Sequence, residues 1–115
     1  MSLKILHNPR CSKSRATLQL LQERGLEPDV ILYLETPPTQ DELRSILGKL
    51  GRTPRELIRK GEAEYRELGL DRPDVTDEQL IAAMVSHPRL IERPVVLSGD
   101  RAAVGRPPES VLEIL

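Results

Sequence analysis

The chain has 115 residues, enough for one domain with a single core but too few for two independent domains. Hydrophobic residues make up 38% of it and charged residues 30%, which excludes a disordered tail and a collagen-like repeat. Because 18 acidic residues nearly cancel 17 basic ones, the net charge is -1, and a non-specific nucleic-acid binder or a polybasic membrane anchor is disfavoured.

The first third of the sequence predicts a strand, a helix and a second strand. Residues 3–6 form an apolar run that ends at turn-forming residues, as a short buried strand does. A helix is expected from Ser12, with Gly25 as its C-terminal stop. Cys11 therefore lies at the start of this helix. The continuous apolar run 30–34 is typical of a strand covered on both faces.

The middle of the chain, about residues 39–90, predicts only helices. A threonine followed three residues later by Glu or Gln marks a helix start, and this pattern occurs at Thr39, Thr53 and Thr76. A further short helix is expected over residues 62–68.

Two strands and a helix are expected at the C-terminal end. Residues 95–97 and 102–104 flank the turn-forming sequence Ser-Gly-Asp, and Pro107 suits the first turn of a helix. The element order predicts an α/β fold, a thioredoxin-like mixed four-stranded sheet with a helical insertion between its two halves. We expect residues 1–115 to form one such domain, with the insert at about 39–90.

Several binding classes are not expected. One cysteine cannot form an intramolecular disulfide or a thiolate-rich metal cage, and two distant histidines do not complete a metal site. With two tyrosines as the only aromatic residues, the chain has no platform for stacking nucleic-acid bases. No apolar stretch has the length of a signal peptide or a membrane span. We therefore expect a cytoplasmic protein without bound metal, nucleic acid or membrane.

Cys11 is the strongest candidate for chemistry. The helix dipole and the free N–H groups at a helix start favour a thiolate over a thiol. Ser14 and Arg15 follow three and four residues later on the same helical face, where both would favour the anion. A lone cysteine is often a small buried hydrophobe, but the polar residues on both sides speak against a core position.

The segment Cys11-Ser12-Lys13-Ser14 resembles a redox C-x-x-C motif whose second thiol is replaced by a hydroxyl. Such a site cannot close its own disulfide, so an external thiol, glutathione or a partner redox protein, must resolve a mixed disulfide. A phosphatase-type C-x5-R loop is excluded because Thr17 stands where the arginine is needed.

Three arginines and one histidine are weaker candidates. Arg59, Arg93 and Arg106 each lie at the edge of a predicted element, and planar guanidinium groups suit a tetrahedral oxyanion. Most arginines are solvated surface residues, so spacing alone does not select these three. His7 could orient or stabilise the thiolate from four residues before Cys11, although an isolated histidine more often packs or faces solvent.

Four segments are spread over nearly the whole chain: HNPRCSKSR at 7–15, YLETP at 33–37, RPVV at 93–96 and GRPPE at 105–109. Together, and in this order, they resemble the glutaredoxin-coupled arsenate reductase family. The resemblance implies that Cys11 attacks arsenate while Arg59, Arg93 and Arg106 bind the oxyanion. It also implies that glutathione attacks the adduct, that arsenite leaves, and that glutaredoxin reduces the remaining mixed disulfide. No bound cofactor is implied.

The resemblance assigns supporting roles as well. His7, Ser14 and Arg15 match the family's shell around the thiolate, and Pro94 matches a cis proline beside the cysteine. Arg10 and the pair 12–13 stand where well-studied members have smaller, uncharged residues, and Gly105 replaces a cysteine. These features resemble a neighbouring branch, so the substrate is expected to be arsenate or a related oxyanion.

Two other functions compete with a reductase. One is a thioredoxin-like regulatory protein that binds RNA polymerase and senses oxidation through a C-x-x-C switch. Ser14 argues against the disulfide switch but not against polymerase binding. The other is a redox-inert adaptor that keeps the fold.

Overall fold

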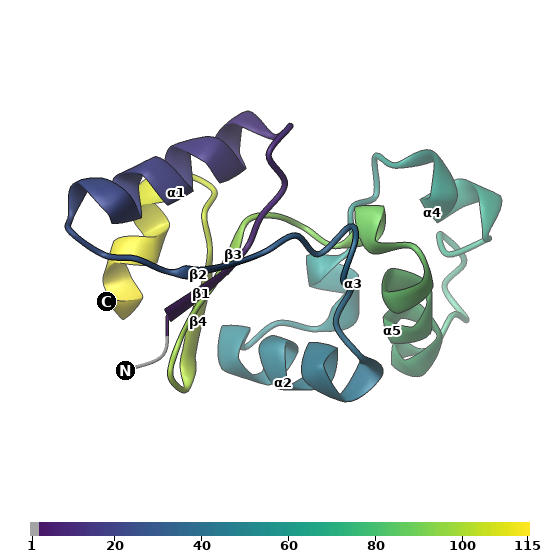
Figure 1. Cartoon of the computed structure of the whole chain (residues 1–115). Coiled ribbons are helices and arrows are strands. Elements are labelled where there is room, and N and C mark those ends of the chain that lie inside the picture. The colour runs from purple at the N-terminus through teal and green to yellow at the C-terminus, as the bar shows by residue number, and fades with distance from the viewer. Residues whose placement is uncertain (1–2) are drawn as a thin grey trace. The chain divides into compact units, whose positions relative to one another are not determined.

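The computed structural model describes residues 3–115 and divides the chain into two compact units (Figure 1). The first unit combines the chain through Thr36 with Arg93–Leu115, and the second comprises Pro37–Glu92. Within residues 3–115, no helix has the length and apolar character that crossing a membrane requires.

The first unit is built on a four-stranded sheet in the order β2-β1-β3-β4. Its strands are β1 (Leu3–Leu6), β2 (Asp29–Ile31), β3 (Val95–Ser98) and β4 (Arg101–Val104). β1 runs parallel to β2 and antiparallel to β3, which forms a hairpin with β4. This mixed sheet confirms the predicted thioredoxin-like α/β fold.

Two helices pack against each other and against the sheet of the first unit. They are α1 (Ser12–Glu23) and the C-terminal 3-10 helix η2 (Pro108–Ile114), drawn in purple-blue and yellow in Figure 1. Their shared core is purely aliphatic, since Phe and Trp are absent from the chain. It consists of Ile5, Leu21, Val96, Val111 and Ile114. Burial of such side chains, each contributing about 1.5–3 kcal/mol, anchors α1 on the strand that precedes Cys11.

The second predicted strand is wrong in extent and environment. β2 ends at Ile31, and Val30 within it is 45% exposed. Leu32 and Leu34 beyond it are also exposed. The reason is topological, because β2 lies at the sheet edge and pairs with β1 on one side. A continuous apolar run does not distinguish an edge strand from a central one.

The second unit holds the helices α2 (Gln40–Leu50), α3 (Pro54–Leu57), α4 (Ala63–Glu67) and α5 (Asp77–Ser86) and the 3-10 helix η1 (Pro88–Leu90). The predicted capping boxes are all present: Thr39, Thr53 and Thr76 each accept a hydrogen bond from the backbone N–H three residues on. α5 packs against α2, α3 and η1.

Arg55 of α3 organises the irregular segment between α4 and α5. Its Nη1 donates to the Tyr65 hydroxyl at 3.1 Å and to the Leu70 carbonyl at 3.0 Å. Its Nη2 donates to the carbonyls of Arg72 and Val75 at 3.3 and 3.4 Å. One guanidinium thus donates to one hydroxyl of α4 and to three backbone carbonyls of the loop between α4 and α5.

Replacing Arg55 by Met should destabilise the second unit. The variant keeps the apolar stem but removes the guanidinium donor from the Leu70 and Val75 carbonyls, at a cost of about 1–3 kcal/mol. Urea unfolding followed by circular dichroism measures the change. Arg66→Met, at an exposed position of α4, is the control and should unfold like the wild type. Equal unfolding midpoints for the two variants would contradict the assignment.

Candidate active site

Cys11 is the N-cap residue of α1. Its backbone is extended, with φ -95° and ψ 124°, and its N–H donates to the Asn8 carbonyl at 3.0 Å. The first turn of α1 contains no acidic residue, so the positive end of the helix dipole faces the sulfur without a competing carboxylate from that turn. This confirms the predicted location of the cysteine at the junction of a strand-ending loop and a helix.

Cys11 is a buried residue, at 7% exposure. The expectation that its polar neighbours keep it out of the interior is therefore wrong. Those neighbours point to solvent, as exposed Arg10, Ser12 and Lys13 show, while the sulfur turns inward. Its environment is not purely aliphatic, however, because a guanidinium reaches it.

Arg106 provides that guanidinium. Its Nη2 donates to Cys11 Sγ at 3.7 Å, and its Nε donates to the Arg93 carbonyl at 2.9 Å. The second bond fixes the plane of the guanidinium, so that the first is directed at the sulfur. A cation in this position stabilises a thiolate and can also receive an anion that approaches it. The structure thus brings together Cys11, Arg106 and the backbone of Arg93.

Gly105 allows this arrangement by having no side chain. Its N–H donates to the Pro94 carbonyl at 2.9 Å. A Cβ at this position would collide with the Thr17 hydroxyl of α1 and lie 2.8 Å from Pro94 Cγ. The segment before Arg106 is therefore packed closely between α1 and the start of β3. The peptide bond before Pro94 is cis, as the family resemblance implied.

Ser14 and Arg15 fasten the loop that precedes Cys11. The Ser14 hydroxyl accepts a hydrogen bond from the Asn8 N–H at 3.0 Å and is hydrogen-bonded to His7 Nδ1 at 2.6 Å. Arg15 Nη1 donates to the Pro9 carbonyl at 2.9 Å. The same-face spacing predicted direct stabilisation of the sulfur, whereas these bonds stabilise the loop that carries it. The Asn8 side chain, which the sequence analysis did not select, accepts from the Arg10 N–H at 3.0 Å.

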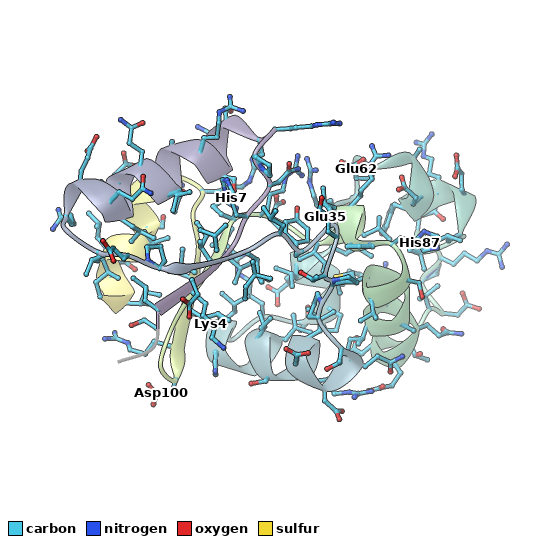
Figure 2. The ribbon with its side chains drawn as sticks, viewed as in Figure 1. Lys4, His7, Glu35, Glu62, His87 and Asp100 are labelled. Carbon is cyan, nitrogen blue, oxygen red and sulfur yellow. The ribbon has the colours of Figure 1, made fainter. Side chains whose placement is uncertain are left out.

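His7 lies buried at the end of β1. Burial lowers its pKa from the ordinary value, and the positive charge of Arg15 lowers it further. The imidazole is therefore neutral at pH 7. Figure 2 labels His7 on the first unit, beside the start of α1. A neutral ring hydrogen-bonded to Ser14 is suited to hold the loop rather than to supply positive charge to the sulfur.

Arg59 belongs to the second unit and makes ion pairs there. Its Nη1 lies 2.6 Å from Glu62 Oε1, and its Nε lies 3.6 Å from Glu92 Oε1. These two carboxylates were not among the site residues predicted from the sequence. Their only signal would have been the three-residue spacing of Arg59 and Glu62, which is common in surface ion pairs. Among residues 3–115, no group of three or more His, Cys, Asp and Glu side chains is arranged to hold a metal ion.

Fold and site together define a thioredoxin-like protein with a single cysteine at a helix start, contacted by an arginine. The chain belongs to the ArsC family, whose match covers residues 6–114.

Curated and solved relatives cover almost the whole chain. "Uncharacterized protein YfgD" of Escherichia coli (strain K12) is 54% identical, over 98% of this chain and 96% of its own. The arsenate reductase of Neisseria meningitidis serogroup A is 50% identical, over 98% of this chain and 97% of its own. The solved structure of an arsenate reductase from Vibrio cholerae is 51% identical and superposes with a TM-score of 0.97, over 100% of this chain and 98% of that one.

Stability should fall in mild acid because of His7. The pKa of His7 is lowered in the folded protein, so the unfolded chain binds more protons between that lowered value and the ordinary value of about 6.5. The free energy of unfolding therefore decreases as pH drops through this window. Urea titrations at several pH values measure the slope. His7→Gln should flatten the slope, and a slope that His7→Gln leaves unchanged would contradict the assignment.

Proposed function

We propose that the protein is a cytoplasmic arsenate reductase in which Cys11 is the nucleophile and glutathione and glutaredoxin supply the electrons. The observation that carries the proposal is the hydrogen bond from the Arg106 guanidinium to Cys11 Sγ at the start of α1. This pairing gives a stabilised thiolate beside a donor group for an oxyanion. The names of the relatives supply the substrate class, because reductases about 50% identical over the full chain act on arsenate.

The first step forms a sulfur–arsenic bond. The Cys11 thiolate attacks the arsenic of arsenate, and one arsenate oxygen takes up protons and leaves as water. Arg106 lies where it can neutralise charge on the remaining oxygens, and the helix dipole of α1 acts in the same sense. We assign the same role to the guanidinium groups of Arg93 and Arg59, as the family resemblance implies.

The second and third steps return the cysteine to its reduced state. A glutathione thiolate attacks Cys11 Sγ, forming a disulfide, and the electron pair of the sulfur–arsenic bond stays on arsenic, which leaves as arsenite. A glutaredoxin thiolate then attacks the glutathione sulfur and releases the Cys11 thiolate. Two external thiols are thus oxidised to one disulfide while arsenic(V) becomes arsenic(III).

The chain itself favours an external reductant. Cys11 is its only cysteine, and the Ser14 hydroxyl that replaces a second thiol is hydrogen-bonded to His7 and Asn8. An internal disulfide is therefore excluded. The comparisons favour a reductase over a polymerase-binding regulator, because the relatives that match the whole chain include proteins named arsenate reductase.

A coupled assay tests the reaction. With glutathione, glutaredoxin, glutathione reductase and NADPH, the protein should oxidise NADPH when arsenate is added. Cys11→Ser should abolish this rate because a hydroxyl is a poor nucleophile at neutral pH. Ser12→Ala, at the exposed neighbouring position, is the control and should retain it. An arsenate-independent rate that is equal in wild type and Cys11→Ser would reject the proposal.

Replacing the proposed oxyanion arginines should weaken arsenate use. Arg59→Ala, Arg93→Ala and Arg106→Ala should each lower kcat/KM for arsenate on the order of 100-fold, since each removes one donor to the developing charge. Steady-state kinetics at saturating glutathione and glutaredoxin measure the effect. Arg101→Ala, at an exposed position of β4, is the matched control and should leave kcat/KM unchanged. An arginine whose loss has no greater effect than that of Arg101 has no part in the site.

A further inference from the structure

The second unit contains a compact ion-pair cluster around Glu62. Its Oε1 lies 2.6 Å from Arg59 Nη1, and its Oε2 lies 3.2 Å from Arg89 Nη2. Two more carboxylates complete the cluster, Glu92 at 3.6 Å from Arg59 Nε and Glu64 at 3.9 Å from Arg89 Nη1. Glu62 is thus the one member in this described cluster that pairs with both arginines. Figure 2 labels it at the turn that leads into α4.

Burial sets Glu62 and Arg59 apart from ordinary surface pairs. The Glu62 side chain is 17% exposed and the Arg59 side chain 24%, whereas Arg89 is 65% exposed. Exposed ion pairs contribute little because water screens them and both side chains lose entropy. A mostly enclosed pair with a short contact holds its geometry better.

The backbone around Arg59 is also fixed. The Arg59 N–H donates to the Leu90 carbonyl at 2.7 Å, and Ile58 forms an isolated bridge with Ile91. The Glu92 N–H donates to the Leu57 carbonyl at 3.2 Å. The base of the Arg59 side chain is therefore held by backbone bonds, and the carboxylates act on its guanidinium end.

The position of Glu62 in the chain is informative as well. It is the N-cap residue of α4, but its side chain makes no capping hydrogen bond. Both carboxylate oxygens face arginines instead, although at an N-cap an acceptor side chain usually binds its own helix. Local helix stability thus does not account for the direction of this side chain.

We propose that Glu62 is a positioning residue for Arg59. Its carboxylate binds Nη1 of Arg59, so that the guanidinium is already oriented before the oxyanion binds. This inference rests on the proposed function, in which Arg59 binds arsenate. An arginine side chain otherwise loses much rotamer freedom on binding, and preorganisation removes that cost from the binding step. Arg89, at the other oxygen, keeps the Glu62 carboxylate in place.

Kinetics with a neighbouring control provide the first test. Glu62→Ala should raise KM for arsenate about tenfold, with a smaller change in kcat, because Arg59 loses its orientation. Glu62→Gln should restore part of the affinity, since its amide oxygen can still accept from Arg59. Glu64→Ala removes the same charge two residues away without touching Arg59 and should leave KM within about twofold. An equal rise in KM for Glu64→Ala would show an effect of net charge and overturn the proposal.

A double-mutant cycle separates positioning from general destabilisation. Adding Glu62→Ala to Arg59→Ala should produce no further rise in KM, because the group that Glu62 positions is already absent. Additive effects of the two substitutions would overturn the proposal. Circular dichroism of each variant verifies folding, and the isosteric Glu62→Gln serves where Glu62→Ala does not fold.

A readout without turnover separates this inference from the proposed function. The side-chain Nη–H resonances of Arg59, which face Glu62, are assigned by their loss in Arg59→Lys. They should shift towards the values of exposed arginines in Glu62→Ala and stay unchanged in Glu64→Ala. If the wild type reduces no arsenate, the proposed function fails, and this measurement still decides whether Glu62 orients Arg59. Arg59 Nη–H resonances that are identical in the wild type and Glu62→Ala would refute the positioning role.

Discussion

The contact between a guanidinium and a sulfur at the start of a helix is the interaction on which the proposed chemistry of this protein depends. Arg106 comes from the end of the chain and Cys11 from its beginning, and the sheet of the first unit brings them together. A thiolate in a mostly buried place is costly unless a charge or a set of donors compensates for lost hydration. Here the start of α1 and the Arg106 guanidinium lie at the sulfur, as such compensation requires. The same groups favour any anion that approaches the sulfur.

Close packing makes this contact possible. β1 delivers the chain to the loop before Cys11, and α1 returns along the sheet on an aliphatic core. Ser14 and Arg15 tie the loop down, while Gly105 lets the segment before Arg106 lie against Thr17 and Pro94. Each of these residues fixes the position of neighbouring backbone. The supporting residues around the cysteine therefore hold the backbone in place as well as contributing charge.

The sequence predicted most of the fold because its signals are local. The threonine capping boxes, the glycine after α1 and the turn between β3 and β4 each depend on a few adjacent residues. The environment of β2 was mispredicted because edge and centre of a sheet are set by distant partners. The burial of Cys11 was mispredicted for a similar reason, since exposed neighbours do not reveal where one side chain turns. The bond between Arg106 and Cys11 spans 95 positions, and no periodicity reports such a contact. Among the sequence signals, only the family resemblance pointed to that arginine.

The small accessible area of the cysteine limits how disulfide exchange can proceed. A thiol must attack along the axis of the bond that breaks, and the sulfur of a cysteine that is only 7% exposed can be reached from few directions. Slim reagents such as a tripeptide can meet this requirement more easily than a folded protein can. In the proposed reaction, the sulfur of the attached tripeptide would be the target of the second thiol. In the proposed reaction, the order of a small thiol and then a protein thiol therefore agrees with the limited steric access to Cys11.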